Sequence, residues 1–174
     1  MQPPNLDGTG QWRNSEIIVR YRRWCMCLNQ RPAGISATEG FYGERGWACV
    51  VVRQLVALMK TGDLAAAWIA IELIEEDGGF AFGRLLKAEC ARELRRMSLN
   101  EEQKQRIRQR VVTMLALGFV PHEFRQYSRL ARHIGLGSAA QDLEALRAHP
   151  NPWVGWHIGY LLDGTHGPHP DRRD

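Results

Sequence analysis

Residues 47–59, WACVVVRQLVALM, and residues 64–74, LAAAWIAIELI, are two apolar runs in the middle of the chain. Both are apolar on almost every side of a helical period, which is typical of helices buried at the centre of a fold. Between them, Thr61-Gly62-Asp63 forms a turn that places Asp63 as the N-cap of the second run. The pattern predicts two packed central helices, over about residues 44–60 and 64–74. The β-branched run at 50–52 leaves a short strand as the alternative for part of the first.

Apolar residues in the rest of the chain recur every three or four positions, which favours helices over strands. Capping residues, glycines and prolines separate further helices, expected over about residues 14–28, 84–97, 98–117, 121–134, 138–146 and 153–162. Ser98 and Glu101 have the spacing of a capping box for one of them. No convincing repeat of about 34 to 47 residues is present.

These elements predict an all-α fold of about seven or eight helices, with neighbours stacked as antiparallel hairpins in a bundle or a short α-solenoid-like arrangement. Residues 1–163 are expected to form a single helical domain, and residues 164–174 a mobile tail. The 174 residues are 44% apolar and 24% charged, a composition that excludes a disordered or collagen-like chain.

The sequence lacks the features that place a chain in or across a membrane. No apolar stretch approaches the length of a membrane span, and the N-terminal MQPPNLDGTGQWRN has no apolar core of signal-peptide length. The four cysteines, Cys25, Cys27, Cys49 and Cys90, lie in apolar helical patterns, where a free thiol behaves as a small hydrophobe. We therefore expect reduced thiols, a cytoplasmic location and no membrane partner.

Enzyme motifs are mostly missing from the chain. There is no G-x-S-x-G, no H-E-x-x-H and no C-x-x-C, and the glycines Gly40, Gly43 and Gly46 lack the flanking residues of a nucleotide-binding loop. The sequence thus predicts no catalytic residues, no metal and no cofactor. A weaker alternative is an enzyme whose site combines Glu72 or Glu75 with His122 or His133.

An arginine stripe is the sharpest candidate binding feature. Only Lys60, Lys87 and Lys104 are lysines among the 23 basic residues, and the net charge is +4. In the helix expected after Pro121, Arg125, Arg129 and Arg132 are spaced to lie on one face, with His122 near the same line. Arginine favours bidentate contacts with carboxylates and phosphates. The stripe therefore indicates either a docking surface for an anion or an ordinary solvated face.

A second basic row, Arg84, Arg92 and Arg95 with Arg96 beside it, lies on the helix expected over 84–97. An acidic cluster, Glu72, Glu75 and Glu76, sits at the end of a preceding helix, where negative charge is unfavourable. The neighbouring arginine-rich helices are the simplest partners for these acids. Pairing of this kind would make the basic rows internal rather than functional.

Aromatic residues Trp153, Trp156 and Tyr160 form a stripe on the last helix. Packing in the core is the default interpretation of such a stripe. Exposed tryptophan and tyrosine are also frequent anchors of protein interfaces, so an interface patch is the alternative.

These observations predict a non-enzymatic helical module, an adaptor, inhibitor or complex subunit that docks an acidic surface of a partner protein through the arginine stripe. Nucleic-acid binding through phosphate contacts of the arginine-rich helices is the alternative.

Overall fold

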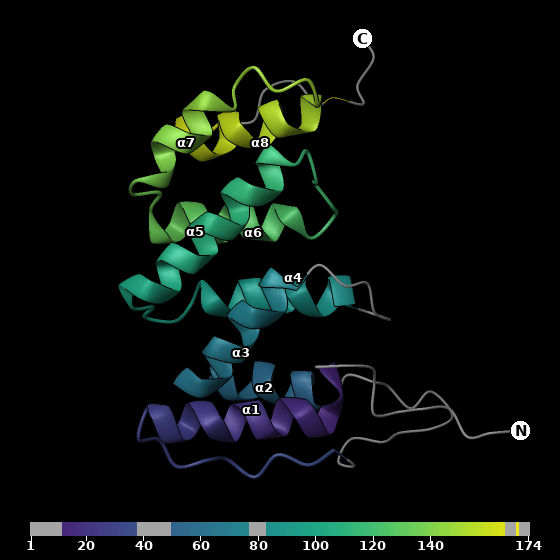
Figure 1. The fold of residues 1–174 in the computed structure, drawn as a ribbon, viewed down its shortest axis with the longest axis vertical. Coiled ribbons are helices and arrows are strands. Elements are labelled where there is room, and N and C mark those ends of the chain that lie inside the picture. The colour runs from purple at the N-terminus through teal and green to yellow at the C-terminus, as the bar shows by residue number, and fades with distance from the viewer. Residues whose placement is uncertain (1–11, 38–49, 77–82, 166–169, 171–174) are drawn as a thin grey trace, which may run out of the picture. The chain divides into compact units, whose positions relative to one another are not determined.

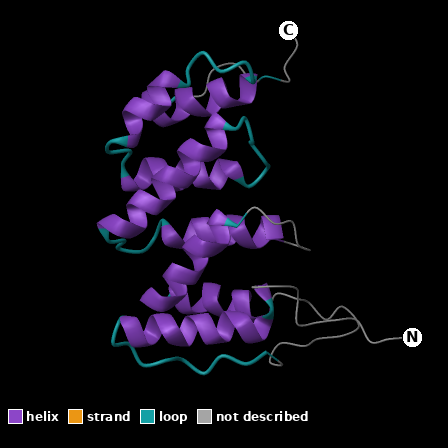
Figure 2. Ribbon diagram, in the orientation of Figure 1, coloured by secondary structure: helices purple, strands orange, loops and turns teal. Residues whose placement is uncertain are grey.

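The computed structural model describes residues 12–37, 50–76, 83–165 and 170 (Figure 1). All regular secondary structure in these ranges is helical (Figure 2), so the all-α prediction is confirmed. Eight helices lie in the described part of the chain: α1 (Asn14–Cys27), α2 (Val50–Met59), α3 (Leu64–Glu75), α4 (Gly83–Leu94), α5 (Glu101–Ala116), α6 (Phe124–Ile134), α7 (Ala139–Ala145) and α8 (Pro152–Asp163). Among them, no helix has both the length and the apolar character needed to cross a bilayer.

The chain divides into two compact units, Met1–Met97 with α1 to α4 and Ser98–Asp174 with α5 to α8. The prediction of one domain over residues 1–163 stays a prediction. Most of the tail predicted over 164–174 lies outside the described residues, and so do Cys49 and the glycine loop at 40–46.

Helix α3 is the centre of the first unit. Nine of its twelve residues are buried, and it contacts α1, α2 and α4. Asp63 caps it as predicted, with its Oδ1 accepting a hydrogen bond from the Ala66 amide at 2.8 Å. The strand alternative for residues 50–52 is wrong, because these valines are buried in the first turn of α2. Their apolar packing against α3 outweighs the β-preference of valine.

Helix α1 lies antiparallel to α3 in the same unit. Tyr21, late in α1, donates a 2.7 Å hydrogen bond to Oδ2 of Asp63 at the start of α3. Trp12, just before α1, donates to Glu76 at the end of α3, with Nε1 to Oε2 at 2.8 Å. Cys25 is buried in this seam, but Cys27 is exposed, which corrects the expectation for that thiol. Side chains two positions apart on a helix point about 200° apart around its axis, so Cys25 and Cys27 cannot both face the core.

The second unit is a ring of four helices, in which α5 contacts α6, α6 contacts α8, α8 contacts α7 and α7 contacts α5. The capping box of α5 uses Asn100 and Gln103, not the predicted Ser98 and Glu101. Gln103 is buried, so its side chain is held where it accepts from the Asn100 amide at 3.0 Å. Tertiary packing therefore selects between two sequence patterns that both fit a cap.

Buried Arg108 joins α5 to the end of α6. Its Nε donates to the Gly135 carbonyl at 2.7 Å, its Nη2 to the Ile134 carbonyl at 3.3 Å, and its Nη1 to Glu101. A cation is favourable at this end of a helix, where the carbonyls carry partial negative charge. These contacts join the middle of α5 to the C-terminal end of α6.

Candidate interaction surface

Helix α6 has an apolar face and a basic face on opposite sides. Phe124, Tyr127, Leu130 and Ala131 are buried, as their spacing predicts. Opposite them, Arg125 and Arg132 are exposed and Arg129 is half-buried. The helix begins at Phe124 rather than at Pro121, because residues 121–123 form a turn in which the Phe124 amide donates to the Pro121 carbonyl at 2.9 Å. His122 is exposed in that turn.

Arg132, the last member of the predicted stripe, has an internal role. Its Nη1 donates to the Tyr160 carbonyl at 2.9 Å, and its Cζ lies 5.0 Å from the centroid of the Tyr160 ring. The guanidinium also lies close to Gly164, which ends α8. Arg132 therefore links α6 to the C-terminal end of α8 through a helix carbonyl and a cation–π contact.

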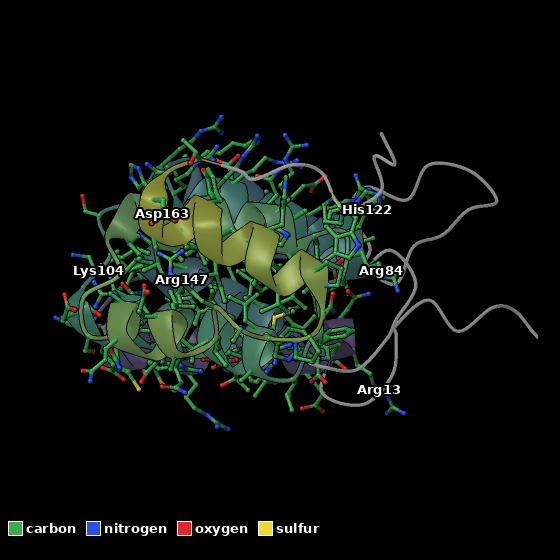
Figure 3. All side chains as sticks on the ribbon, turned by 90° about the horizontal axis from the view of Figure 1, so that it is seen from above. Arg13, Arg84, Lys104, His122, Arg147 and Asp163 are labelled. Carbon is green, nitrogen blue, oxygen red and sulfur yellow. The ribbon has the colours of Figure 1, made fainter. Side chains whose placement is uncertain are left out.

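The remaining three residues, His122, Arg125 and Arg129, form what we call the basic edge. None of their side chains makes a hydrogen bond or ion pair with the part of the chain that the structure describes. Glu123, which stands between two of them in sequence, is buried and forms no ion pair with them. Figure 3 places His122 on the far side of this unit from Lys104 and from the Arg147–Asp163 ion pair, whose Nη2 and Oδ1 are 2.9 Å apart.

The turn that leads into the basic edge exposes two large apolar side chains, which the sequence analysis missed. Leu117 is 76% exposed and Phe119 is 49% exposed. Gly118 between them has φ of 67° and ends α5 in a Schellman motif. In the sequence, a glycine between two large apolar residues at the end of a helix indicates the turn, but it does not indicate that the two side chains are exposed.

The second basic row is broken by the end of α4. The helix stops at Leu94, three residues before the predicted end, so Arg95 and Arg96 lie in the following turn while Arg92 is exposed on the helix. Arg96 pairs with Glu93, with Nη1 and Oε1 2.7 Å apart. These three arginines therefore do not form one helical face.

Glu72, near the end of α3, is paired with α1, not with the arginine-rich helices that the sequence suggested. Glu72 accepts from Arg20 at 3.0 Å and from Nε1 of Trp24 at 2.8 Å. The Arg20 guanidinium lies over the Trp12 ring, 4.3 Å from its centroid, and its burial lowers the pKa of Arg20. The Trp24 ring stacks on Trp68 at 4.4 Å. The enzymatic alternative combines Glu72 or Glu75 with His122 or His133 and stays a prediction; of these acids, the Glu72 carboxylate is occupied by Arg20 and Trp24.

The aromatic stripe of α8 is half-buried. Trp153 and Trp156 contact each other edge to face, with centroids 5.8 Å apart, and Tyr160 is covered in part by Arg132. The fully buried face of α8 consists instead of Val154, His157, Ile158 and Leu161. The stripe is therefore neither full core nor an open patch.

Ser128 and His157 form a buried polar pair between α6 and α8 that the sequence analysis missed. The Ser128 Oγ and His157 Nδ1 are 2.9 Å apart, and the hydroxyl donates to the Phe124 carbonyl at 3.2 Å. Both residues are at most 4% exposed, so the hydroxyl is closed off from a substrate. The pair holds two helices in register. In the described ranges, no three His, Cys, Asp or Glu side chains are grouped as metal ligands would be.

No family model, characterised protein or solved structure matches this chain at a significant level.

Proposed function

We propose that this chain is a non-enzymatic helical interaction module that docks an acidic surface of a partner protein through the basic edge, His122, Arg125 and Arg129. The observation that carries the proposal is that these side chains have no acidic partner among the described residues, while Arg125 and Arg129 lie one turn apart on α6. Arg132, predicted as a fourth contact, acts instead as a support for α8.

Electrostatics favour such a partner. Like charges one helical turn apart cost a few tenths of a kcal/mol, and a partner carboxylate removes that cost. Arginine also binds carboxylates through two parallel hydrogen bonds, which fixes orientation as well as affinity. Complementary charge across an interface chiefly raises the association rate and excludes wrong partners. The free thiols of Cys25, Cys27 and Cys90 are consistent with a reducing compartment such as the cytoplasm.

Capture of partners from native lysate by the tagged full chain tests the proposal. The double variant Arg125→Glu/Arg129→Glu reverses the charge of the basic edge. Arg22→Glu/Arg23→Glu, on the exposed face of α1, is the matched control with the same change in net charge. We expect a protein that survives nuclease treatment to be captured by the native chain and by the control but lost by the α6 variant. Equal capture by both variants would remove the basic edge from the proposal.

Nucleic-acid binding is the second candidate, and exposed Arg84 and Arg92 on α4 favour it, since neither has an ion-pair partner in the described ranges. It predicts that the captured material is sensitive to nuclease and that affinity falls steeply as salt is raised. Loss of capture in Arg84→Glu/Arg92→Glu, with the α6 variant unaffected, would replace the first proposal by this one.

A further inference from the structure

The exposed apolar turn and the basic edge are consecutive along the chain. Leu117 and Phe119 are 76% and 49% exposed, and His122 and Arg125 follow within six residues of Phe119. Exposed leucine and phenylalanine are unfavourable in water unless a partner covers them. A turn that exposes apolar side chains and is followed in the chain by basic side chains without ion-pair partners supplies the two components of an interface, an apolar centre and a charged rim.

The backbone of this turn is held in place before any partner arrives. The Gly118 amide donates to the Leu115 carbonyl and the Phe119 amide to the Met114 carbonyl, each at 2.9 Å. On the other side, Nδ2 of Asn151 donates to the Gly118 carbonyl at 2.9 Å. A fixed turn loses little conformational entropy on binding, so its apolar side chains contribute more of their burial to affinity.

We propose that Leu117, Phe119 and the basic edge form one composite docking surface whose occupant is an acidic amphipathic helix of another protein. The inference rests on the proposed function and adds the apolar half of the surface. Arg125 and Arg129 are one helical turn apart, about 6 Å along the axis, which matches carboxylates at positions i and i+4 of a partner helix. Large apolar residues beside those acids pack on Leu117 and Phe119, as in helix recognition by apolar surfaces.

The apolar turn favours this occupant over a phosphate backbone. Phosphates would engage Arg125 and Arg129 and leave Leu117 in water, whereas an amphipathic helix covers both parts of the surface. Leu117 and Phe119 should therefore contribute to the affinity for an amphipathic helix but not to the affinity for a phosphate backbone.

Two synthetic helical peptides of roughly 16 residues, about four turns, test the inference by fluorescence anisotropy with the full chain. Both carry glutamates at i, i+4 spacing, but only one has leucine and phenylalanine beside them; the other has alanine there. We expect the amphipathic peptide to bind about tenfold or more tighter than its alanine counterpart. Leu117→Ala/Phe119→Ala should abolish that difference, and Val19→Ala/Met26→Ala, which removes equally exposed apolar side chains from α1, should preserve it.

The outcomes separate the inference from the proposed function. Equal binding of both peptides, or a full difference retained in Leu117→Ala/Phe119→Ala, overturns the inference. If Arg125→Glu/Arg129→Glu still loses binding in that case, the proposed function stands. If that variant binds as the native chain does, the proposed function falls as well. If neither peptide binds, the acidic helix is overturned as the occupant. If a single-stranded oligonucleotide binds instead, the basic edge is assigned to nucleic acid.

Discussion

Glu72 shows how one side chain organises the first unit. Its two carboxylate oxygens accept from Arg20 and from the Trp24 indole, and the Arg20 and Glu72 side chains are 19% and 22% exposed. Hydrogen bonds that involve ionised groups are stronger than neutral ones, and a partly buried donor left without its acceptor is costly. The carboxylate therefore matters less for charge at the surface than for satisfying two donors of α1.

Replacement of Glu72 by alanine is expected to destabilise the chain. The variant removes the carboxylate that accepts from the Arg20 guanidinium and from Trp24 Nε1, so the free energy of unfolding should fall by about 1–3 kcal/mol. Urea unfolding followed by tryptophan fluorescence measures the change. Glu89→Ala is the control, because Glu89 is a half-exposed helical glutamate that forms no ion pair with described residues. If the two variants lose the same stability, the pairing with α1 contributes nothing.

At the scale of helices and turns, local sequence predicts the elements better than their ends. The buried faces of α3 and α6 follow directly from the spacing of apolar residues. The start of α5 is less predictable, since Ser98 with Glu101 and Asn100 with Gln103 both resemble a capping box, and burial of Gln103 decides between them.

Contacts between distant helices escape local patterns altogether. Arg20 and Glu72 are 52 residues apart, and Arg132 and Tyr160 are 28 residues apart. Spacing shows that Arg125, Arg129 and Arg132 share a face, but only the tertiary structure distinguishes the arginine that supports α8 from the two that remain available. The same limit explains why exposure of Leu117 and Phe119 could not be predicted, because nothing local says whether another helix covers them.

Gly118 is expected to be the residue on which the turn between α5 and α6 depends. It has φ of +67°, and a Cβ there would lie 3.1 Å from Cε1 of His149. Gly118→Ala should therefore lower the free energy of unfolding by about 1 kcal/mol or more. Gly155→Ala is the control. Gly155 lies in α8, and beyond its chain neighbours and the backbone of its own helix no heavy atom lies within 4 Å of the added Cβ, so this variant should be neutral or stabilising. A stable Gly118→Ala variant would show that the turn adjusts without cost.

The second unit as a whole is expected to lose stability in acid. Hydrogen bonds from Arg147 hold the pKa of Asp163 below its ordinary value, and Arg108 does the same for Glu101. Both carboxyls have lower pKa values in the folded chain than in the unfolded chain. The stability that they contribute to the fold is therefore present above about pH 4 and is lost as the pH falls through their pKa values in the folded chain.

Urea unfolding of the full chain between about pH 2 and pH 6 measures this loss. Glu101→Gln/Asp163→Asn should flatten the fall in stability below about pH 4. Glu102→Gln/Asp142→Asn is the matched control, because both carboxylates are exposed and form no ion pair with described residues. An unchanged slope in the first variant would show that these ion pairs form equally in the unfolded chain.

At the scale of the whole molecule, the question is whether the second unit is a domain. Each of its helices contacts two others of the same unit, and Ile107, Phe124, Leu130 and Ile158 are at most 1% exposed. Its polar contacts, Arg108 with the end of α6, Ser128 with His157 and Arg132 with Tyr160, also lie within it. A segment with its own core and with internal polar contacts of this kind can fold alone.

We therefore expect residues 98–174, expressed separately, to give a helical circular dichroism spectrum, dispersed amide resonances and cooperative thermal unfolding. A fragment of residues 118–174 is the control. It lacks α5, which contacts both α6 and α7, so the ring is open and the fragment should remain unfolded. Folding of 98–174 would replace the single domain predicted over 1–163 by two domains. It would also place the basic edge and the apolar turn, Leu117 to Phe119, together on a module that can be studied by itself. An unfolded 98–174 fragment would mean instead that this core needs the first unit, as a single domain requires.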